Sequence, residues 1–233
     1  MIQRGLLPEF SPAALAQARS FRGAALESGP AIRDLRDRLW CSIDNDDSRD
    51  LDQLSVSESL ANGAVRILVA IADVDALVER DTPIDQHART NTTSVYTAAE
   101  IFPMLPERLS TDLTSLNQDC DRMAMVVEMT VTSDGTVTDS DVYRAIVRNK
   151  AQLAYDAVAA WLDGRAAPPP RLAAVAGLDE ELRIQDRVAQ SMRAVRFRRG
   201  ALLLDTIEPR AVYDGDVLMD MRADEKNRAK ELI

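Results

Sequence analysis

The order of apolar and polar residues predicts a sheet built from two hairpins. Apolar, β-prone segments at residues 54–58 and 65–71 are separated by Asn62 and Gly63, a pair that is a strong hairpin-turn signal. Segments at residues 123–132 and 136–148 flank Asp134 and Gly135 in the same way. These four segments predict a largely antiparallel sheet.

Helical spacing of apolar residues marks several other segments. We predict helices at residues 11–19, 32–38, 83–89, 153–162 and about 178–199, the last ending before Gly200. Residues 222–233 also have a strong helical pattern, without a terminating Gly or Pro. The proline-rich residues 163–170 predict a flexible connector. Hairpins that alternate with helices indicate an α+β fold, in which helices pack on a largely antiparallel or mixed sheet.

Length and composition allow a sizeable hydrophobic core. The chain has 233 residues, of which 46% are hydrophobic, and this length is typical of one domain or two. Residues 1–39 are rich in Ala, Arg and Leu, and we predict that they form a helical lead-in without a core of its own. Residues 40–233 then form the main domain.

The net charge of the chain is −10, which is unusual for a protein that binds a polyanion. The local distribution of charge matters more for binding, and residues 183–199 contain six arginines against one acid, Asp186. This basic stretch lies on the last part of the helix predicted from residue 178. It either lines a binding channel or forms a solvated helix face whose cations favour the negative end of the helix dipole.

Several classes of protein have little support in this sequence. The two cysteines, Cys41 and Cys120, are far apart and form no metal-type pair, which predicts a reducing, cytoplasmic setting. No run approaches the roughly 18 apolar residues of a membrane span, and the first ten residues lack the apolar core of a signal peptide. The only histidine, His87, is expected on the surface of the helix after Pro83, so mechanisms that need a pair of histidines are unsupported.

An acidic segment is the strongest chemical signal in the chain. Residues 44–52 have the sequence DNDDSRDLD, in which five carboxylates accompany one arginine, Arg49. At an effective dielectric of roughly 20, two such charges about 4 Å apart repel by about 4 kcal/mol, so crowding them requires a cation. Carboxylate oxygens are preferred ligands of Mg²⁺ and Mn²⁺. Asp50 and Asp52 are two residues apart and point to the same side if the chain is extended, and Asp44 closes the pocket from the preceding turn.

Two other interpretations of this segment compete with the metal site. Acidic runs of this length are commonly solvated loops without a ligand, and on spacing alone the two possibilities are about equal. A calcium-binding loop is disfavoured, because its sixth position holds Arg49 instead of Gly and its twelfth holds Ser55 instead of Glu.

Several blocks together resemble the catalytic domain of the ribonuclease II and ribonuclease R family of exoribonucleases. They are SIDNDDSRDLDQ at residues 42–53, VAIADVDALV at 69–78, TSVYTAAEIFPMLPERLSTDLTSLN at 93–117, NKAQLAYDAVAAW at 149–161 and RRGALLLD at 198–205. The resemblance implies hydrolysis of single-stranded RNA from its 3′ end, with release of nucleoside 5′-monophosphates. It also implies a site for Mg²⁺, with Mn²⁺ as the alternative ion, held by Asp44, Asp50 and Asp52, with Asp52 the most directly catalytic. The family's fourth acid falls on Gln53, whose amide oxygen can ligate a metal but adds no charge.

The resemblance also assigns residues that hold RNA. Tyr96 matches a tyrosine that stacks on a base, and Tyr155 matches one that lines the pocket near the RNA 3′ end. Glu231 matches a glutamate that helps to recognise the ribose there, and Leu204 falls where the family has an aromatic clamp. Without the resemblance, packing of Tyr155 on the adjacent helix with Trp161 would be the preferred interpretation.

The family pattern predicts further sequence beyond residue 233. Members continue with an arginine that contacts the scissile phosphate and usually with a C-terminal RNA-binding barrel, and we expect this missing part to be needed for activity. Two alternatives to the nuclease are a noncatalytic RNA- or metal-binding remnant of such an enzyme and a carboxylate-metal phosphatase. Stepwise shortening of RNA would distinguish the nuclease from both.

Overall fold

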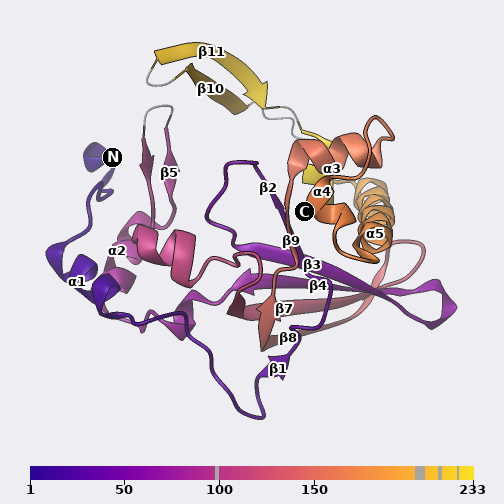
Figure 1. The fold of residues 1–233 in the computed structure, drawn as a ribbon, viewed down its shortest axis with the longest axis horizontal. Coiled ribbons are helices and arrows are strands. Elements are labelled where there is room, and N and C mark those ends of the chain that lie inside the picture. Colours follow the sequence, from indigo (N-terminus) through magenta and orange to yellow (C-terminus); the bar gives the residue numbers. More distant parts are fainter. Residues whose placement is uncertain (98–99, 203–207, 215–216, 225) are drawn as a thin grey trace.

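A seven-stranded sheet forms the centre of the protein in the computed structural model, which describes residues 1–97, 100–202, 208–214, 217–224 and 226–233 (Figure 1). The strand order is β1-β8-β7-β4-β3-β2-β9. The strands are β1 (Arg33–Asp34), β2 (Cys41–Asp44), β3 (Gln53–Ser59), β4 (Val65–Ala72), β7 (Asp121–Val131), β8 (Val137–Arg148) and β9 (Ala151–Ala154).

Both predicted hairpins are confirmed. β3 and β4 pair antiparallel, and the turn between them places Asn62 at φ 61° and Gly63 at φ 75°, which is the backbone conformation that this residue pair favours. β7 and β8 also pair antiparallel around Gly135, whose φ is 87°. A Cβ atom on Gly135 would lie 2.4 Å from the carbonyl oxygen of Ser191, so glycine permits the turn and its close approach to helix α5 (Leu178–Arg198).

The sheet is mixed, because its two outer pairs are parallel. β1 pairs with β8, and β9 pairs with β2. β2 and β3 are antiparallel and share one pairing position, Cys41 opposite Ser55. The chain therefore leaves the sheet after Asp44 and rejoins it at Gln53, so the acidic segment bridges two neighbouring strands.

Three of the helix predictions fail wholly or in part. Residues 32–38 are not helical: they contain β1, and the Trp40 indole donates to the Leu35 carbonyl oxygen at 2.8 Å, which fixes a turn against the sheet core. The helix predicted from residue 153 begins at Tyr155, because residues 151–154 are held as β9 by pairing with β2.

The third of these predictions, a helix over residues 222–233, is confirmed only in its last part. Residues Val217–Asp224 form β11, which pairs antiparallel with β10 (Glu208–Asp214), and the helix is limited to Arg228–Leu232. Asn227 caps this helix by accepting a hydrogen bond from the Lys230 amide at 3.0 Å.

The longer helices form two groups on different sides of the sheet (Figure 1). One group packs around a core cluster that includes Ile84 and Leu109, and the other shares a core cluster with β2 and β9 that includes Trp161 and Leu182. The predictions of helices at residues 11–19, 83–89 and 178–199 are confirmed. The first group contains α1 (Pro12–Ser20), α2 (Pro83–Asn91) and the π-helical turn η4 (Arg108–Leu113), with β5 (Val95–Tyr96) and β6 (Ile101–Phe102). The second contains α3 (Tyr155–Leu162), α4 (Pro170–Ala173), α5 and α6 (Arg228–Leu232). Short 3-10 turns are η1 (Ile2–Arg4), η2 (Ala61–Gly63) and η3 (Val74–Ala76).

His87 lies on α2 as predicted, but its expected position on the surface is wrong. Its side chain is 4% exposed, its ring lies 4.1 Å from the Phe10 ring, and its Nε2 atom is 3.0 Å from the Asn91 side-chain amide. Cys41 and Cys120 are both free thiols, and burial raises the pKa of Cys41 to about 12. Within the described ranges, no helix is long and apolar enough to cross a bilayer.

Candidate functional site

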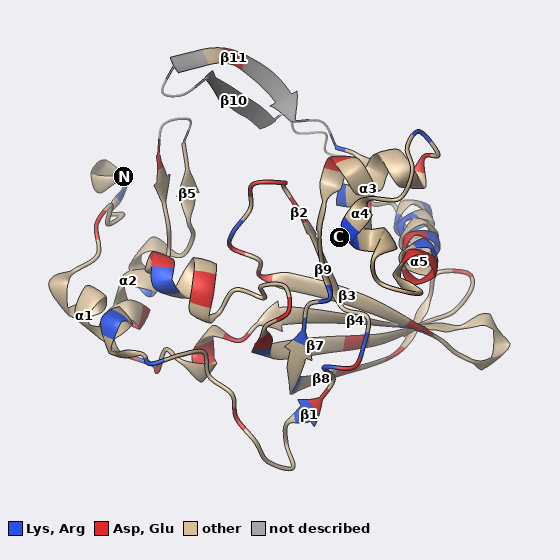
Figure 2. Ribbon diagram, viewed as in Figure 1, with Lys and Arg blue, Asp and Glu red and all other residues tan. Residues whose placement is uncertain are grey.

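The acidic segment projects from the sheet between β2 and β3, and Figure 2 shows the acidic residues on this turn. Its last part is extended and alternates in burial, with Leu51 1% exposed between the exposed Asp50 and Asp52. The Leu51 carbonyl oxygen accepts from the Leu116 amide at 2.7 Å, and the Asp52 carbonyl oxygen accepts from the Ala72 amide at 2.9 Å. Burial of Leu51 therefore directs the two flanking carboxylates toward solvent.

Tyr96, on β5, contacts this acidic segment. Its hydroxyl donates to Oδ2 of Asp50 at 3.1 Å, and its side chain is 64% exposed. Desolvation raises the pKa of Tyr96, and the negative charge and hydrogen bond of Asp50 raise it further. The residue predicted to stack on RNA is thus linked to a residue predicted to hold the metal.

Asp44 and Asp50, the other two predicted metal ligands, both affect the pKa of Asp52. Partial desolvation by the surrounding chain is the largest cause that raises the pKa of Asp52, and repulsion from Asp44 and Asp50 raises it further. A hydrogen bond from its own backbone amide opposes this shift. Asp44 and Asp50 are therefore both close enough to repel the charge of Asp52, and a cation bound beside Asp52 would relieve that repulsion.

The side chains themselves do not converge on one point. In the part of the chain that the structure describes, no group of three or more Asp, Glu, His or Cys side chains is arranged to hold a metal ion. The Asp44 carboxylate accepts instead from the neighbouring Asn45 amide at 2.7 Å. Gln53 is half-buried at the start of β3, opposite Ile71.

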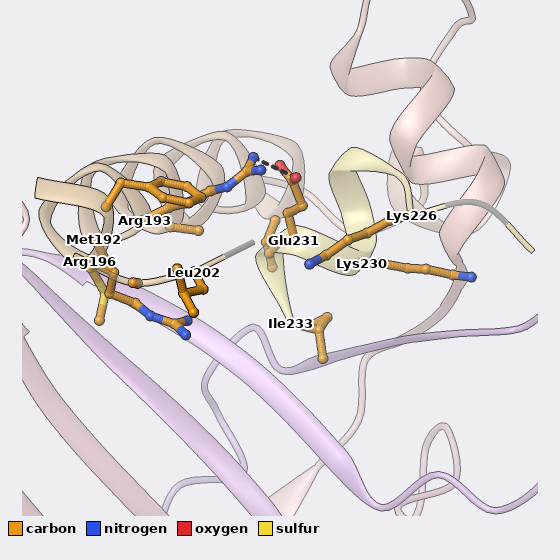
Figure 3. Close-up of a pocket in the computed structure, with 12 residues that line it drawn as sticks. Met192, Arg193, Arg196, Leu202, Lys226, Lys230, Glu231 and Ile233 are labelled. Carbon is orange, nitrogen blue, oxygen red and sulfur yellow. Dashed lines mark ion pairs between the residues drawn. The ribbon is translucent and has the colours of Figure 1, made fainter. Parts of the chain in front are cut away.

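Glu231 lines a pocket of about 480 Å³ between α5 and α6 (Figure 3). Its carboxylate forms an ion pair with Arg193 at 2.5 Å and accepts from the Gln190 side-chain amide at 3.4 Å. Arg196 and Lys226 also line this pocket, so its charge is mainly positive. Leu204, the predicted clamp residue, lies outside the described residues.

Tyr155 is half-buried at the start of α3. It packs against the core cluster that contains Trp161, and the Lys230 ammonium lies 5.7 Å from its ring centroid. The structural interpretation of Tyr155 thus has direct support from packing. Lys230 neighbours Glu231 on α6, so Tyr155 lies near the same helix as the predicted ribose-binding residue.

Sequence reasoning missed the residues that hold these side chains in place. The Ser115 hydroxyl and the Gln152 side-chain amide bond to the backbone of the acidic segment, and Arg193 pairs with Glu231. Ser115 falls inside the block at residues 93–117 and Arg193 inside the basic stretch at 183–199, but neither position has a pattern that predicts its partner. Gln152 likewise falls inside the block at residues 149–161, where no pattern predicts its contact with the Ser48 carbonyl oxygen.

Comparison with known proteins places the chain in a family. Residues 32–233 match the RNB domain. The chain is 36% identical over 201 residues to ribonuclease R of Escherichia coli, which is 86% of this chain and 24% of that protein. It is 35% identical over 183 residues to ribonuclease R of Vibrio parahaemolyticus, which is 78% of this chain and 22% of that protein. The chain thus spans about a quarter of the length of these curated relatives.

The fold agrees with this assignment. Superposition on Mycoplasma genitalium RNase R in complex with ribose-methylated single-stranded RNA gives a TM-score of 0.87 at 24% identity and covers 100% of this chain and 36% of that one. The sequence match extends over most of the chain and includes the acidic segment. The chain therefore belongs to the RNB domain family.

Proposed function

We propose that this chain forms the acidic part of the active site of a metal-dependent 3′-to-5′ exoribonuclease, which hydrolyses single-stranded RNA to nucleoside 5′-monophosphates. Relatives named ribonuclease R support this class of reaction. The two free thiols of this chain, Cys41 and Cys120, are typical of a reducing compartment, and we therefore propose that the protein is cytoplasmic.

The position of Asp52 near Asp44 and Asp50 supports this proposal most strongly. Desolvation raises the pKa of Asp52, and the charges of Asp44 and Asp50 raise it further, in a segment that the fold holds at the sheet surface. Carboxylates with a perturbed pKa are common at catalytic sites. Hard oxygen donors fit Mg²⁺ or Mn²⁺, so the donor set matches the proposed ion.

Asp44, Asp50 and Asp52 would hold the ion, and the Gln53 amide oxygen would add a neutral donor. When bound, such a cation lowers the pKa of a ligated water and neutralises charge on the phosphate. The protein's own part is to orient the acids. Tyr96 contributes by donating to Asp50, and this contact leaves most of its ring exposed for a base of the RNA.

The RNA 3′ end would lie toward α3 and α6. Tyr155 and Glu231 both belong to this region, and basic residues line the pocket beside Glu231. A carboxylate that accepts from ribose hydroxyls would favour RNA over DNA, because only RNA has the 2′-hydroxyl. Leu204 would provide an apolar contact for the terminal base.

One observation favours a second candidate, a noncatalytic RNA- or metal-binding module. The described side chains contain no three-donor group in metal-binding geometry. If the acids never converge, the chain would bind RNA through its basic and aromatic residues without cleaving it.

The direct test uses 5′-labelled single-stranded RNA and the intact natural protein that contains this chain. We expect a ladder of products shortened from the 3′ end in Mg²⁺ or Mn²⁺, release of nucleoside 5′-monophosphates, and no shortening in EDTA. RNA that is bound but never shortened would support the noncatalytic module. Release of phosphate from small monoesters without shortening of RNA would point to a phosphatase.

A further inference from the structure

One buried hydroxyl contacts the backbone on both sides of Asp50. The Ser115 Oγ atom accepts from the Leu51 amide at 3.0 Å and donates to the Arg49 carbonyl oxygen at 2.9 Å. Ser115 is 2% exposed and comes from a segment more than sixty residues further along the chain. A hydroxyl has one proton and two lone pairs, so it can serve as donor and acceptor at the same time.

The segment that carries Ser115 is itself anchored to the sheet. The Arg122 Nε atom on β7 donates to the Ser115 carbonyl oxygen at 2.9 Å. The Asn149 side-chain amide, which is 1% exposed, donates to the Leu116 carbonyl oxygen at 2.9 Å. The Leu116 amide in turn bonds the Leu51 carbonyl oxygen at 2.7 Å. Ser115 is therefore a fixed point against which the acidic segment is held.

We propose that Ser115 is a positioning residue for the metal site, which fixes the peptide groups around Asp50 and thereby sets the spacing of Asp50 and Asp52. This inference rests on the proposed function. Repulsion among the carboxylates would otherwise splay this exposed segment into water, and a neutral hydroxyl opposes that movement without adding charge to the site. Outer partners of this kind orient metal ligands, and their loss commonly costs about 10- to 100-fold in metal affinity or activity.

A purely structural serine would behave differently. Removing it would lower the stability of the whole fold and leave metal affinity in the folded protein unchanged. Ser57 is a matched control, because it is 3% exposed and its hydroxyl bonds Glu181 on α5 at 3.2 Å, with no contact to the acidic segment. Ser57→Ala removes the same atom from an equally buried site.

The experiment measures Mn²⁺ binding by electron paramagnetic resonance of the free ion for the wild-type protein, Ser115→Ala and Ser57→Ala. We expect Ser115→Ala to raise the Mn²⁺ dissociation constant about 10-fold or more, and Ser57→Ala to stay within about twofold of wild type. Amide hydrogen exchange in metal-free buffer gives a local measurement. Exchange of the Leu51 amide should accelerate in Ser115→Ala and remain unchanged in Ser57→Ala.

Two results would overturn the proposal. Ser115→Ala that binds Mn²⁺ as tightly as wild type would show that the hydroxyl does not position the acids, while the proposed function would stand. A wild-type protein that binds no Mn²⁺ would refute the proposed metal site, and with it this role of Ser115. The exchange data separate local loosening at Leu51 from general destabilisation, so a less stable Ser115→Ala variant still gives a decisive answer.

Discussion

Replacing Asp52 with asparagine should stabilise the metal-free fold and at the same time remove hydrolysis. Asp52→Asn keeps the size of the side chain but removes the charge that Asp44 and Asp50 repel. The pKa of Asp52 is raised above its ordinary value of 3.8 by desolvation and by Asp44 and Asp50, so its charged form is less favourable in the folded state than in the unfolded state. Neutralising this residue relieves that penalty.

The size of the gain follows from the exposure of the group. Because the Asp52 side chain is exposed, solvent screens the repulsion, and we expect a gain of only about 0.5 to 1 kcal/mol at neutral pH. The size of this gain depends on pH. The gain is complete above the raised folded-state pKa of Asp52, declines as pH falls toward 3.8, and disappears below it, where Asp52 is protonated in both states.

Urea unfolding in EDTA at pH 7 and at pH 3 would measure this effect, with Asp139→Asn as the control. Asp139 is an exposed carboxylate on β8, away from the acidic segment. Hydrolysis by Asp52→Asn should fall by at least about 100-fold, comparable with loss of one transition-state stabiliser, while RNA affinity is retained. Destabilisation in metal-free buffer, or a change equal to that of Asp139→Asn, would refute the electrostatic reasoning. Equal loss of hydrolysis and RNA binding would contradict the catalytic role.

Three other substitutions test base stacking, metal binding and the ion pair that holds α6. Tyr96→Ala should weaken binding of single-stranded RNA by about 1 to 3 kcal/mol in fluorescence anisotropy, whereas Tyr96→Phe should keep most of the affinity; equal losses would argue against stacking. Gln53→Asp adds a carboxylate to the acidic segment and should tighten Mn²⁺ binding in a calorimetric titration, and unchanged binding would place Gln53 outside the site. Arg228→Met leaves the Asp186 carboxylate, which is 5% exposed, without its bidentate partner on α6, and should cost about 2 kcal/mol in urea unfolding; an unchanged midpoint would contradict this.

The sequence was sufficient to predict the parts of the fold that depend on local signals. Asn62–Gly63 and Asp134–Gly135 fix the two hairpins, because their preferred backbone conformations match the turns that form. The prediction of a helix at residues 32–38 fails because pairing with β8 and the docking of Trp40 outweigh a helical pattern. Parallel pairing of β9 with β2 likewise overrides the helical pattern at residues 153–154.

The sequence alone predicts which residues form the site but not how they contact one another. The charge of residues 44–52 is visible without a structure, and so is the presence of Tyr96 in a family block. The contact between Tyr96 and Asp50 and the hydrogen bond from Ser115 to Arg49 could not be predicted, because distant segments come together only in the folded protein. Burial of His87 escaped prediction for the same reason, since Phe10 comes from the N-terminal segment.

Anomalous diffraction from crystals of the intact protein grown with Mn²⁺ would show directly whether the acidic segment binds a metal ion. We expect a manganese peak with oxygen ligands from Asp44, Asp50 and Asp52, which requires these side chains to rotate toward one another. Absence of manganese beside this segment at saturating Mn²⁺, with the three carboxylates still directed apart, would contradict it.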